Sequence, residues 1–214
     1  LSDRFAWRYA GVGKGKRSWG NHLAWRRERM ALGSSIILQV VGYQNSGKTT
    51  LISKLLKELG KRHFQTGVIK HHGHENCVDF NDSGKDTEQH RNAGANITCV
   101  TSSNNSILTM NSELPLNKAI ALYETLEMDC ILIEGYKHIP YPRVVLLRNE
   151  KEDMDLLLNS YEVIAAIHSN KPKGTILKES NSPHFMRDDE ELWLNCLITY
   201  ITQEHRRRVD HENV

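Results

Sequence analysis

Short apolar segments alternate with segments of helical spacing along most of this chain. Runs of branched apolar residues that end at glycine or a polar residue predict buried strands, here at residues 36–41, 67–70, 97–101, 106–110, 130–134, 144–147 and 163–167. The segment after the first strand places leucines on one helical face and stops at Gly60. Similar spacing predicts helices at residues 48–59, 85–92, 116–126 and 189–202.

This order of elements is typical of an α/β fold, in which a mostly parallel twisted sheet carries helices on both faces. The polar sequence Ser-Ser-Asn-Asn at residues 102–105 separates two apolar runs, so these two strands predict a short antiparallel element. We therefore expect one α/β domain with a single main sheet.

The overall composition is that of an ordinary soluble protein, with 39% hydrophobic and 25% charged residues. No apolar stretch approaches the roughly 20 residues that a membrane helix needs. The four cysteines form no C-x-x-C pair, which argues against a zinc ribbon or a thioredoxin-like site and favours a reducing cytoplasm.

Charge divides the chain at Met30. Residues 1–30 hold eight Lys/Arg against two Asp/Glu, whereas the remainder holds 20 against 24, and three of the four tryptophans lie in this basic leader. Such a segment suits a nucleic-acid or membrane arm, but the domain pattern begins only after it. We interpret residues 1–30 as a dispensable extension, residues 31–204 as the domain and residues 205–214 as a charged, frayed tail. We expect neither a nucleic acid nor a membrane as partner.

A glycine-rich loop at residues 42–49 matches the pattern G-x-x-x-x-G-K-[ST] between a predicted strand and a predicted helix. Its backbone N–H groups and the helix dipole favour phosphate. We expect Lys48 to reach the β- and γ-phosphates and Thr49 to bind Mg²⁺. The domain is thus predicted to be a P-loop NTPase that binds a nucleoside triphosphate through Gly42, Asn45, Ser46, Gly47, Lys48, Thr49 and Thr50.

Glu134 supplies the second metal anchor that a P-loop protein needs. It follows an apolar strand and precedes Gly135, which places its carboxylate at the edge of the sheet where doubly wound folds bind ligands. We predict that Thr49 and Glu134 share Mg²⁺, and that Lys48 and Glu134 are the catalytic residues. The alternative is a salt-bridged carboxylate at a strand end.

A histidine-rich and acidic loop follows the second predicted strand. Three histidines within four residues, at positions 71, 72 and 74, suit a transition metal, an anionic ligand or plain exposure to solvent. In P-loop proteins this part of the chain often faces the γ-phosphate. We therefore take Asp79 and Asp86 as candidates for Mg²⁺-water contacts, and Lys70 and Lys85 as candidates for neutralising phosphate charge.

Several motifs together resemble the molybdopterin-guanine dinucleotide biosynthesis protein B (MobB) family. Besides the P-loop they are K-H-x-x-H at residues 70–74, Asp79, G-K-D-T at 84–87, Ala-Gly-Ala at 93–95 and E-G-Y-K at 134–137, with weaker echoes at 142–148 and 185–189. The resemblance covers residues 36 to 202. It adds His71, His74, Gly135 and Lys137 to the expected ligand-binding residues.

This resemblance implies a GTP-binding homodimer with slow intrinsic GTP hydrolysis. It also implies that the protein assists molybdenum cofactor biosynthesis beside a MobA-type molybdopterin guanylyltransferase, with molybdopterin as a further ligand. The extension at 1–30 has no counterpart in the resemblance.

The expected preference for GTP over ATP rests on the family resemblance and not on a motif in the sequence. Guanine is commonly selected by N-K-x-D, but residues 170–173 read Asn-Lys-Pro-Lys, which is good turn chemistry. Two other functions stay open on the residues alone. One is a metal-delivery GTPase that uses the histidine loop, and the other is a small-molecule kinase with Arg143 or Arg148 as transition-state cations.

Overall fold

The computed structural model of the chain describes residues 35–71, 83–148, 151–170 and 181–212. Residues 34–214 form one compact unit. The predicted extension at 1–30 therefore lies outside the described residues.

Six strands form the main sheet in the order β2-β5-β1-β6-β7-β8, and every neighbouring pair is parallel. Their bounds are β1 Ile36–Val41, β2 Thr66–Lys70, β5 Cys130–Glu134, β6 Arg143–Leu147, β7 Val163–His168 and β8 His184–Met186. The three central strands are buried at every position. Burial on both faces explains why their sequences are apolar runs instead of alternating patterns.

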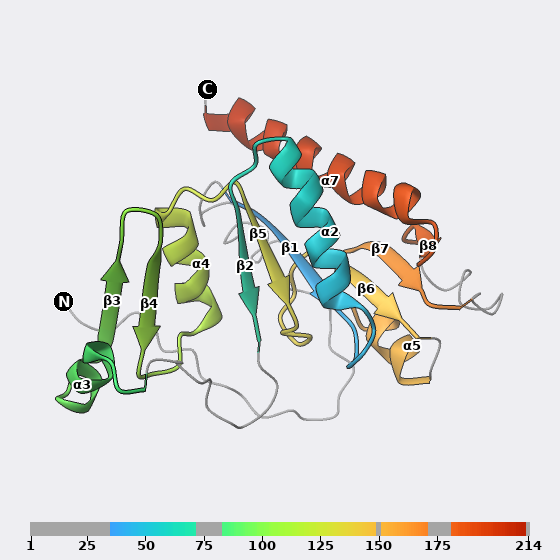
Figure 1. The fold of residues 1–214 in the computed structure, drawn as a ribbon. Coiled ribbons are helices and arrows are strands. Elements are labelled where there is room, and N and C mark those ends of the chain that lie inside the picture. Colours follow the sequence, from blue (N-terminus) through green and yellow to red (C-terminus); the bar gives the residue numbers. More distant parts are fainter. Residues whose placement is uncertain (1–34, 72–82, 149–150, 171–180, 213–214) are drawn as a thin grey trace, which may run out of the picture. The chain divides into compact units, whose positions relative to one another are not determined.

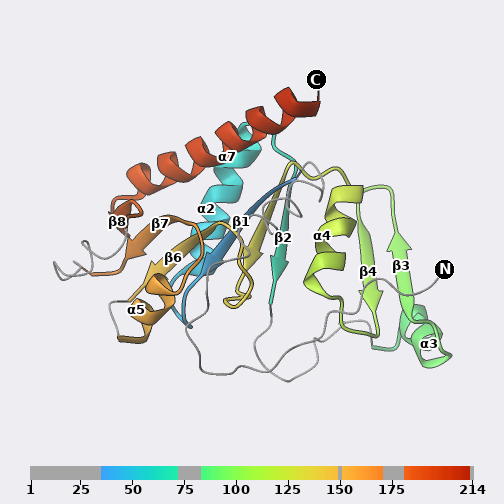
Figure 2. The same ribbon diagram turned by 180° about the vertical axis from the view of Figure 1, so that it is seen from behind.

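Helices cover both faces of this sheet, as predicted. On one face lie α2 (Lys48–Lys61) and α7 (Glu190–Glu212), seen in front of the sheet in Figure 1. On the other lie α4 (Leu116–Thr125) and α5 (Lys151–Leu158), seen in Figure 2. Successive residues of β1 point to opposite faces of the sheet. Leu38 packs with residues of α2 and α7, whereas Ile37 packs with residues of α4.

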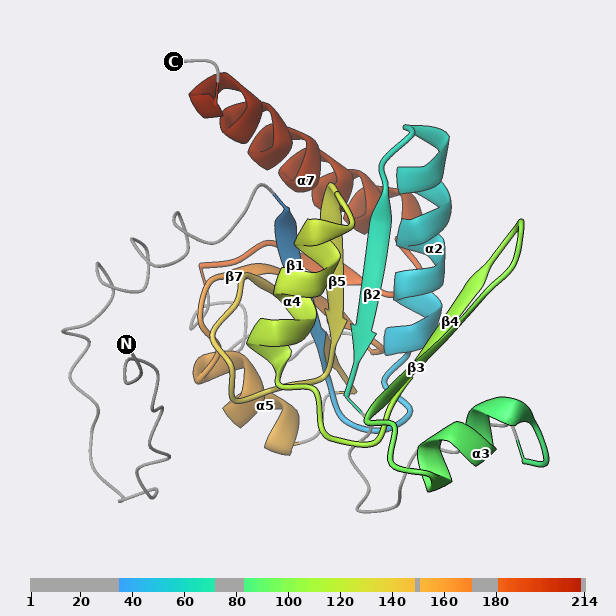
Figure 3. The ribbon, with the colours of Figure 1, turned by 90° about the vertical axis from the view of Figure 1, so that its left-hand side faces the viewer.

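The predicted antiparallel element is a separate two-stranded sheet of β3 (Ile97–Thr101) and β4 (Ser106–Met110). It is preceded by α3 (Asp86–Asn92) and lies beyond the β2 edge of the main sheet (Figures 1 and 3). Arg91 of α3 is buried and donates to Thr109 Oγ1 of β4 at 3.4 Å. This contact ties α3 to the hairpin.

The end of the last helix differs from the prediction. The predicted helix stopped at residue 202 before a frayed tail, but α7 continues through Glu212. Tertiary contacts hold the charged part, because Arg208 donates to the Ser35 carbonyl and the His205 ring packs 5.0 Å from that of Phe64. Within the described residues no helix is both long and apolar enough to cross a membrane.

Two short elements, α5 and β8, were not predicted. The charged residues Glu152, Asp153 and Asp155 obscure the apolar face of α5. The strand β8 has only three residues and becomes a strand only by pairing with β7. Both elements depend on contacts with distant segments that periodicity does not record.

Candidate nucleotide-binding site

The loop at residues 42–49 connects β1 to the first turn of α2 at the carboxyl edge of the sheet. Asn45 and Gly47 adopt left-handed backbone conformations, with φ of 60° and 95°, and asparagine and glycine are the residues that tolerate this region best. A Cβ at Gly42 would overlap Ser46 Oγ and lie 3.0 Å from the Leu146 carbonyl oxygen. Glycine is therefore required at position 42 for the loop to curl back against β6.

Lys48 folds back over this loop. Its Nζ donates to the carbonyl oxygens of Gly42 at 3.1 Å and of Tyr43 at 2.8 Å. Burial lowers the pKa of Lys48, and nearby Lys70 and Arg148 lower it further, while Glu134 opposes them. A cation in these surroundings is stabilised by an anion bound within the loop.

Glu134 ends β5 beside the loop and is only 7% exposed. Its carboxylate accepts from Thr49 Oγ1 at 3.3 Å and lies 3.6 Å from Lys70 Nζ. The predicted pair of Thr49 and Glu134 thus lies together, although they are 85 residues apart in sequence. The salt bridge that was the alternative interpretation of Glu134 is also present, through Lys70.

The residues at this edge fit Mg²⁺ and a triphosphate. A hydroxyl and a carboxylate converge at Thr49 and Glu134, and oxygen ligands are those that Mg²⁺ prefers. Ser46 Oγ is buried without a hydrogen-bond partner in the described structure, inside a loop shaped to surround an anion. Thr49 and Glu134 would hold the metal, which would neutralise phosphate charge.

The segment after β5 is fixed from two sides. Gln39 Nε2 donates to the carbonyl oxygens of Gly135 and Tyr136 at 2.7 Å, and Arg143 donates to those of Lys137 and Ile139. A Cβ at Gly135, where φ is 94°, would lie 3.3 Å from His71 Cβ. This support places the Lys137 ammonium 3.6 Å from the centre of the Tyr43 ring.

Arg143, one of the two cations considered for a kinase, therefore has a structural position. It is 2% exposed, and burial lowers its pKa to about 10, so it stays charged at neutral pH. Its guanidinium donates hydrogen bonds to carbonyl groups of the loop that carries Lys137.

The chain is similar to known proteins over most of this domain. A family model described as "Molybdopterin guanine dinucleotide synthesis protein B" (MobB) matches residues 37–170. The chain belongs to the MobB family. The family resemblance predicted from the motifs is thereby confirmed.

Relatives from two bacteria extend the match. A Bacillus subtilis protein named a probable molybdopterin-guanine dinucleotide biosynthesis adapter protein is 42% identical over 153 residues, which is 72% of this chain and 86% of that protein. A Haemophilus influenzae protein with the same adapter name is 30% identical over 164 residues, or 74% and 89% of the two chains. The crystal structure of Bacillus subtilis MobB aligns with a TM-score of 0.63 and 37% identity, covering 77% of this chain and 96% of that one.

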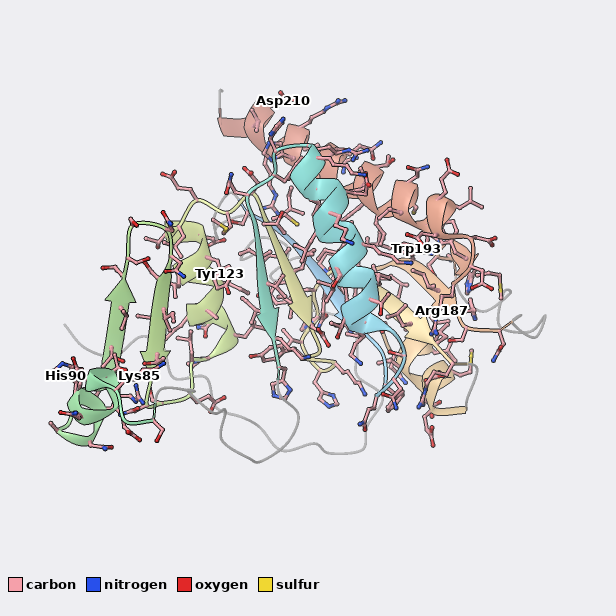
Figure 4. All side chains as sticks on the ribbon, in the orientation of Figure 1. Lys85, His90, Tyr123, Arg187, Trp193 and Asp210 are labelled. Carbon is pink, nitrogen blue, oxygen red and sulfur yellow. The ribbon has the colours of Figure 1, made fainter. Side chains whose placement is uncertain are left out.

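Arg187 lies beyond the segment matched by the MobB family model, and sequence reasoning did not select it as a site residue. Its Nη2 donates to the Ser46 carbonyl oxygen at 2.7 Å and to the Ser169 hydroxyl. Its backbone N–H donates to the His168 carbonyl at 2.8 Å, and its own carbonyl accepts from the Trp193 indole at 3.1 Å. Figure 4 shows Arg187 near the start of α2, below Trp193. Arg187 thus braces the P-loop from the end of β8, a position that only the fold reveals.

Of the remaining predicted site residues, some lie beside the P-loop and others do not. His71 is exposed, its N–H donates to the Glu134 carbonyl at 3.0 Å, and its ring lies 4.7 Å from that of Tyr136. Lys85 and Asp86 are exposed at the start of α3, and Figure 4 shows Lys85 beside His90, on the side of the view opposite Arg187. His74 and Asp79 lie outside the described residues. No group of three or more metal-ligating side chains occurs within the part of the chain that the structure describes.

Proposed function

We propose that this chain is a GTP-binding adapter in molybdopterin-guanine dinucleotide biosynthesis. The observation that carries the proposal is a complete P-loop, with Thr49 and Glu134 in contact, in a member of the MobB family. The names of the two bacterial relatives supply the pathway and the adapter role.

In this proposal each side chain of the loop has one task. Lys48 leaves the Gly42 and Tyr43 carbonyls and moves to the β- and γ-phosphates, while Thr49 and Glu134 hold Mg²⁺. Lys70 balances the charge of Glu134. The preference for GTP follows from the pathway, because the nucleotide that is joined to molybdopterin carries guanine. Molybdopterin would be a further ligand.

Hydrolysis is expected to be slow. Glu134 is the acidic side chain that contacts the P-loop among the described residues, and it is already engaged by Thr49 and Lys70. A carboxylate in these contacts is a poor general base for water. We expect the isolated protein to turn over GTP more slowly than about 1 s⁻¹, below the range of ordinary enzymes.

The proposed partners are a second copy of the chain and a MobA-type guanylyltransferase, and the proposed compartment is the cytoplasm. The β3–β4 hairpin supports self-association. Four of its apolar side chains are 48–60% exposed: Ile97, Val100, Ile107 and Leu108. A two-stranded sheet is marginally stable alone, so a second copy that covers these side chains would stabilise it.

The test is a reconstituted synthesis of molybdopterin guanine dinucleotide from molybdopterin, GTP and Mg²⁺ by the guanylyltransferase. We expect the wild-type chain to raise the amount of product and Lys48→Ala to lose this effect. Lys57→Ala removes an exposed lysine from the same helix and should behave as wild type. Equal stimulation by Lys48→Ala would separate the adapter role from nucleotide binding, and no stimulation by the wild-type chain would refute the role itself.

A further inference from the structure

Two cations lie over one aromatic ring of the P-loop, and each of the three residues follows one of three neighbouring strands. Tyr43 follows β1, Lys137 follows β5 and Arg148 follows β6, and these strands are parallel neighbours whose carboxyl ends share one edge of the sheet (Figure 1). Lys137 Nζ lies 3.6 Å and Arg148 Cζ 5.1 Å from the centre of the Tyr43 ring. Both distances are within the range of cation–π attraction.

Arg148 is held in this position by a buried carboxylate. Asp153 is 0% exposed, accepts from the Arg148 backbone N–H at 2.6 Å and lies 3.3 Å from Arg148 Nη2. Glu152 adds a weaker ion pair at 3.8 Å. The Arg148 side chain is still 25% exposed. Its guanidinium is therefore oriented in advance, with part of its surface open to a ligand.

Lys48 indicates which end of the phosphate chain these cations face. Its ammonium bonds to the Tyr43 carbonyl, and in a P-loop this ammonium binds the β- and γ-phosphates. Arg148 lowers the pKa of Lys48, and Lys48 lowers that of Lys137, so both cations lie close to Lys48, on the side of the loop where it would bind the γ-phosphate. Arg187 contacts the opposite end, at Ser46.

The cations also repel one another. Burial lowers the pKa of Lys137, and Lys48 and Arg148 lower it further. Several like charges around one loop destabilise the empty site, and an anion relieves the repulsion. The γ-phosphate adds the charge that distinguishes a triphosphate from a diphosphate.

We propose that Lys137 and Arg148, held on the Tyr43 ring, contact the γ-phosphate and make the site discriminate GTP from GDP. This inference rests on the proposed nucleotide-binding function. It assigns Arg148 a ligand contact and leaves Arg143 as support for the loop that carries Lys137.

Equilibrium titrations of the full chain with Mg·GTP and Mg·GDP test this. Lys137→Gln and Arg148→Gln should each weaken GTP binding by about tenfold or more, because each removes a charge-assisted contact. GDP binding should change by less than about threefold, since the lost contact is absent from that complex. Arg187→Gln is the matched comparison at the other end of the loop and should weaken both nucleotides alike. Equal losses for GTP and GDP in Lys137→Gln and Arg148→Gln would overturn the inference.

A further variant separates a loss of stability from a loss of binding, because Arg148→Gln leaves Asp153 buried without its cation. The double variant Arg148→Gln/Asp153→Asn removes both charges and should show the same selective loss of GTP with a thermal midpoint closer to wild type. Lys137→Gln needs no such correction. If the wild-type chain binds neither nucleotide, the proposed function fails as well. If it binds both with equal affinity, only the γ-phosphate inference fails.

Discussion

Glu134 ends β5 with its carboxylate beside the P-loop. An apolar strand, an acid and a glycine predicted a carboxylate at the edge of the sheet, and that carboxylate lies 3.3 Å from Thr49 Oγ1. Its strand pairs with β1, so the register brings the acid to the end of the strand that precedes the P-loop.

Replacing this acid tests its role with metal. Glu134→Gln keeps a hydrogen-bond acceptor but removes the charge that would hold Mg²⁺, so the gain in GTP affinity on adding Mg²⁺ should fall by about tenfold or more. Titrations with and without Mg²⁺ measure this gain. Glu58→Gln, an acid paired with Lys61 and Arg62 at the far end of α2, is the control. An unchanged Mg²⁺ gain in Glu134→Gln would remove Glu134 from the metal site.

The buried side chain of His168 should make the stability of the folded chain depend on pH. It ends β7, is 1% exposed, and its Nε2 lies 2.8 Å from His184 Nδ1. Burial and the neighbouring His184 lower the pKa of His168 to about 4. Between pH 6.5 and 4 the unfolded chain binds a proton at this histidine that the folded chain does not bind. The free energy of unfolding should therefore decrease as the pH is lowered through this window, by about 3 kcal/mol at most.

Urea unfolding at pH 7 and pH 5 measures this loss. His168→Gln keeps a side-chain amide that can reach His184 but cannot titrate near neutral pH, so its stability should fall less over the same interval. Equal losses in the variant and the wild-type chain would assign the pH dependence to other groups.

Which residues of the site were predictable depends on where their partners lie. Lys48 and Thr49 belong to a local motif whose backbone determines its geometry, so spacing was sufficient to find them. Arg187 reaches the P-loop only because β8 pairs with β7, and β8 is too short to predict. The cations around Tyr43 were missed as a group because they follow three strands that are distant in sequence.

At the scale of elements, the packing of α4 against β2 depends on one glycine. A Cβ at Gly67 would overlap the ring of Tyr123, whose hydroxyl donates to the Val68 carbonyl at 2.9 Å. Glycine in a strand is unfavourable on propensity alone. Its presence here is explained by this close approach.

Gly67→Ala should therefore destabilise the protein by about 1–3 kcal/mol, as overpacking does elsewhere. Gly60→Ala is the matched control, because a Cβ at Gly60 meets nothing within 4 Å and alanine favours the helix. It should leave the free energy of unfolding unchanged or raise it by up to about 1 kcal/mol. Equal effects of the two substitutions on urea unfolding would contradict this packing account.

Strands marked by short apolar runs between polar or glycine residues were predicted closely, including β1, β3, β4 and β5. The charged end of α7 was not, since its helical state depends on contacts with Ser35 and Phe64. Helical spacing records which face is apolar, whereas these contacts are between residues distant in sequence.

For the whole molecule, the exposed hairpin predicts self-association. Light scattering should give about twice the chain mass of 24.5 kDa for the wild-type protein. Leu108→Lys should shift it to the monomer, because a charge at an apolar interface is unfavourable. Leu192→Lys, at a more exposed position on α7, should not. A monomeric wild-type chain, or a dimer insensitive to Leu108→Lys, would exclude the hairpin as the interface.

We propose that the β1–α2 loop binds GTP. A competition titration, in which GTP and ATP displace a fluorescent guanine nucleotide in the presence of Mg²⁺, tests it most directly. Displacement by GTP at lower concentrations than ATP, together with a loss of about a hundredfold or more in Lys48→Ala but not in Lys57→Ala, is the predicted result. Unchanged GTP binding by Lys48→Ala would exclude this loop as the binding site, and a preference for ATP would exclude GTP as its nucleotide.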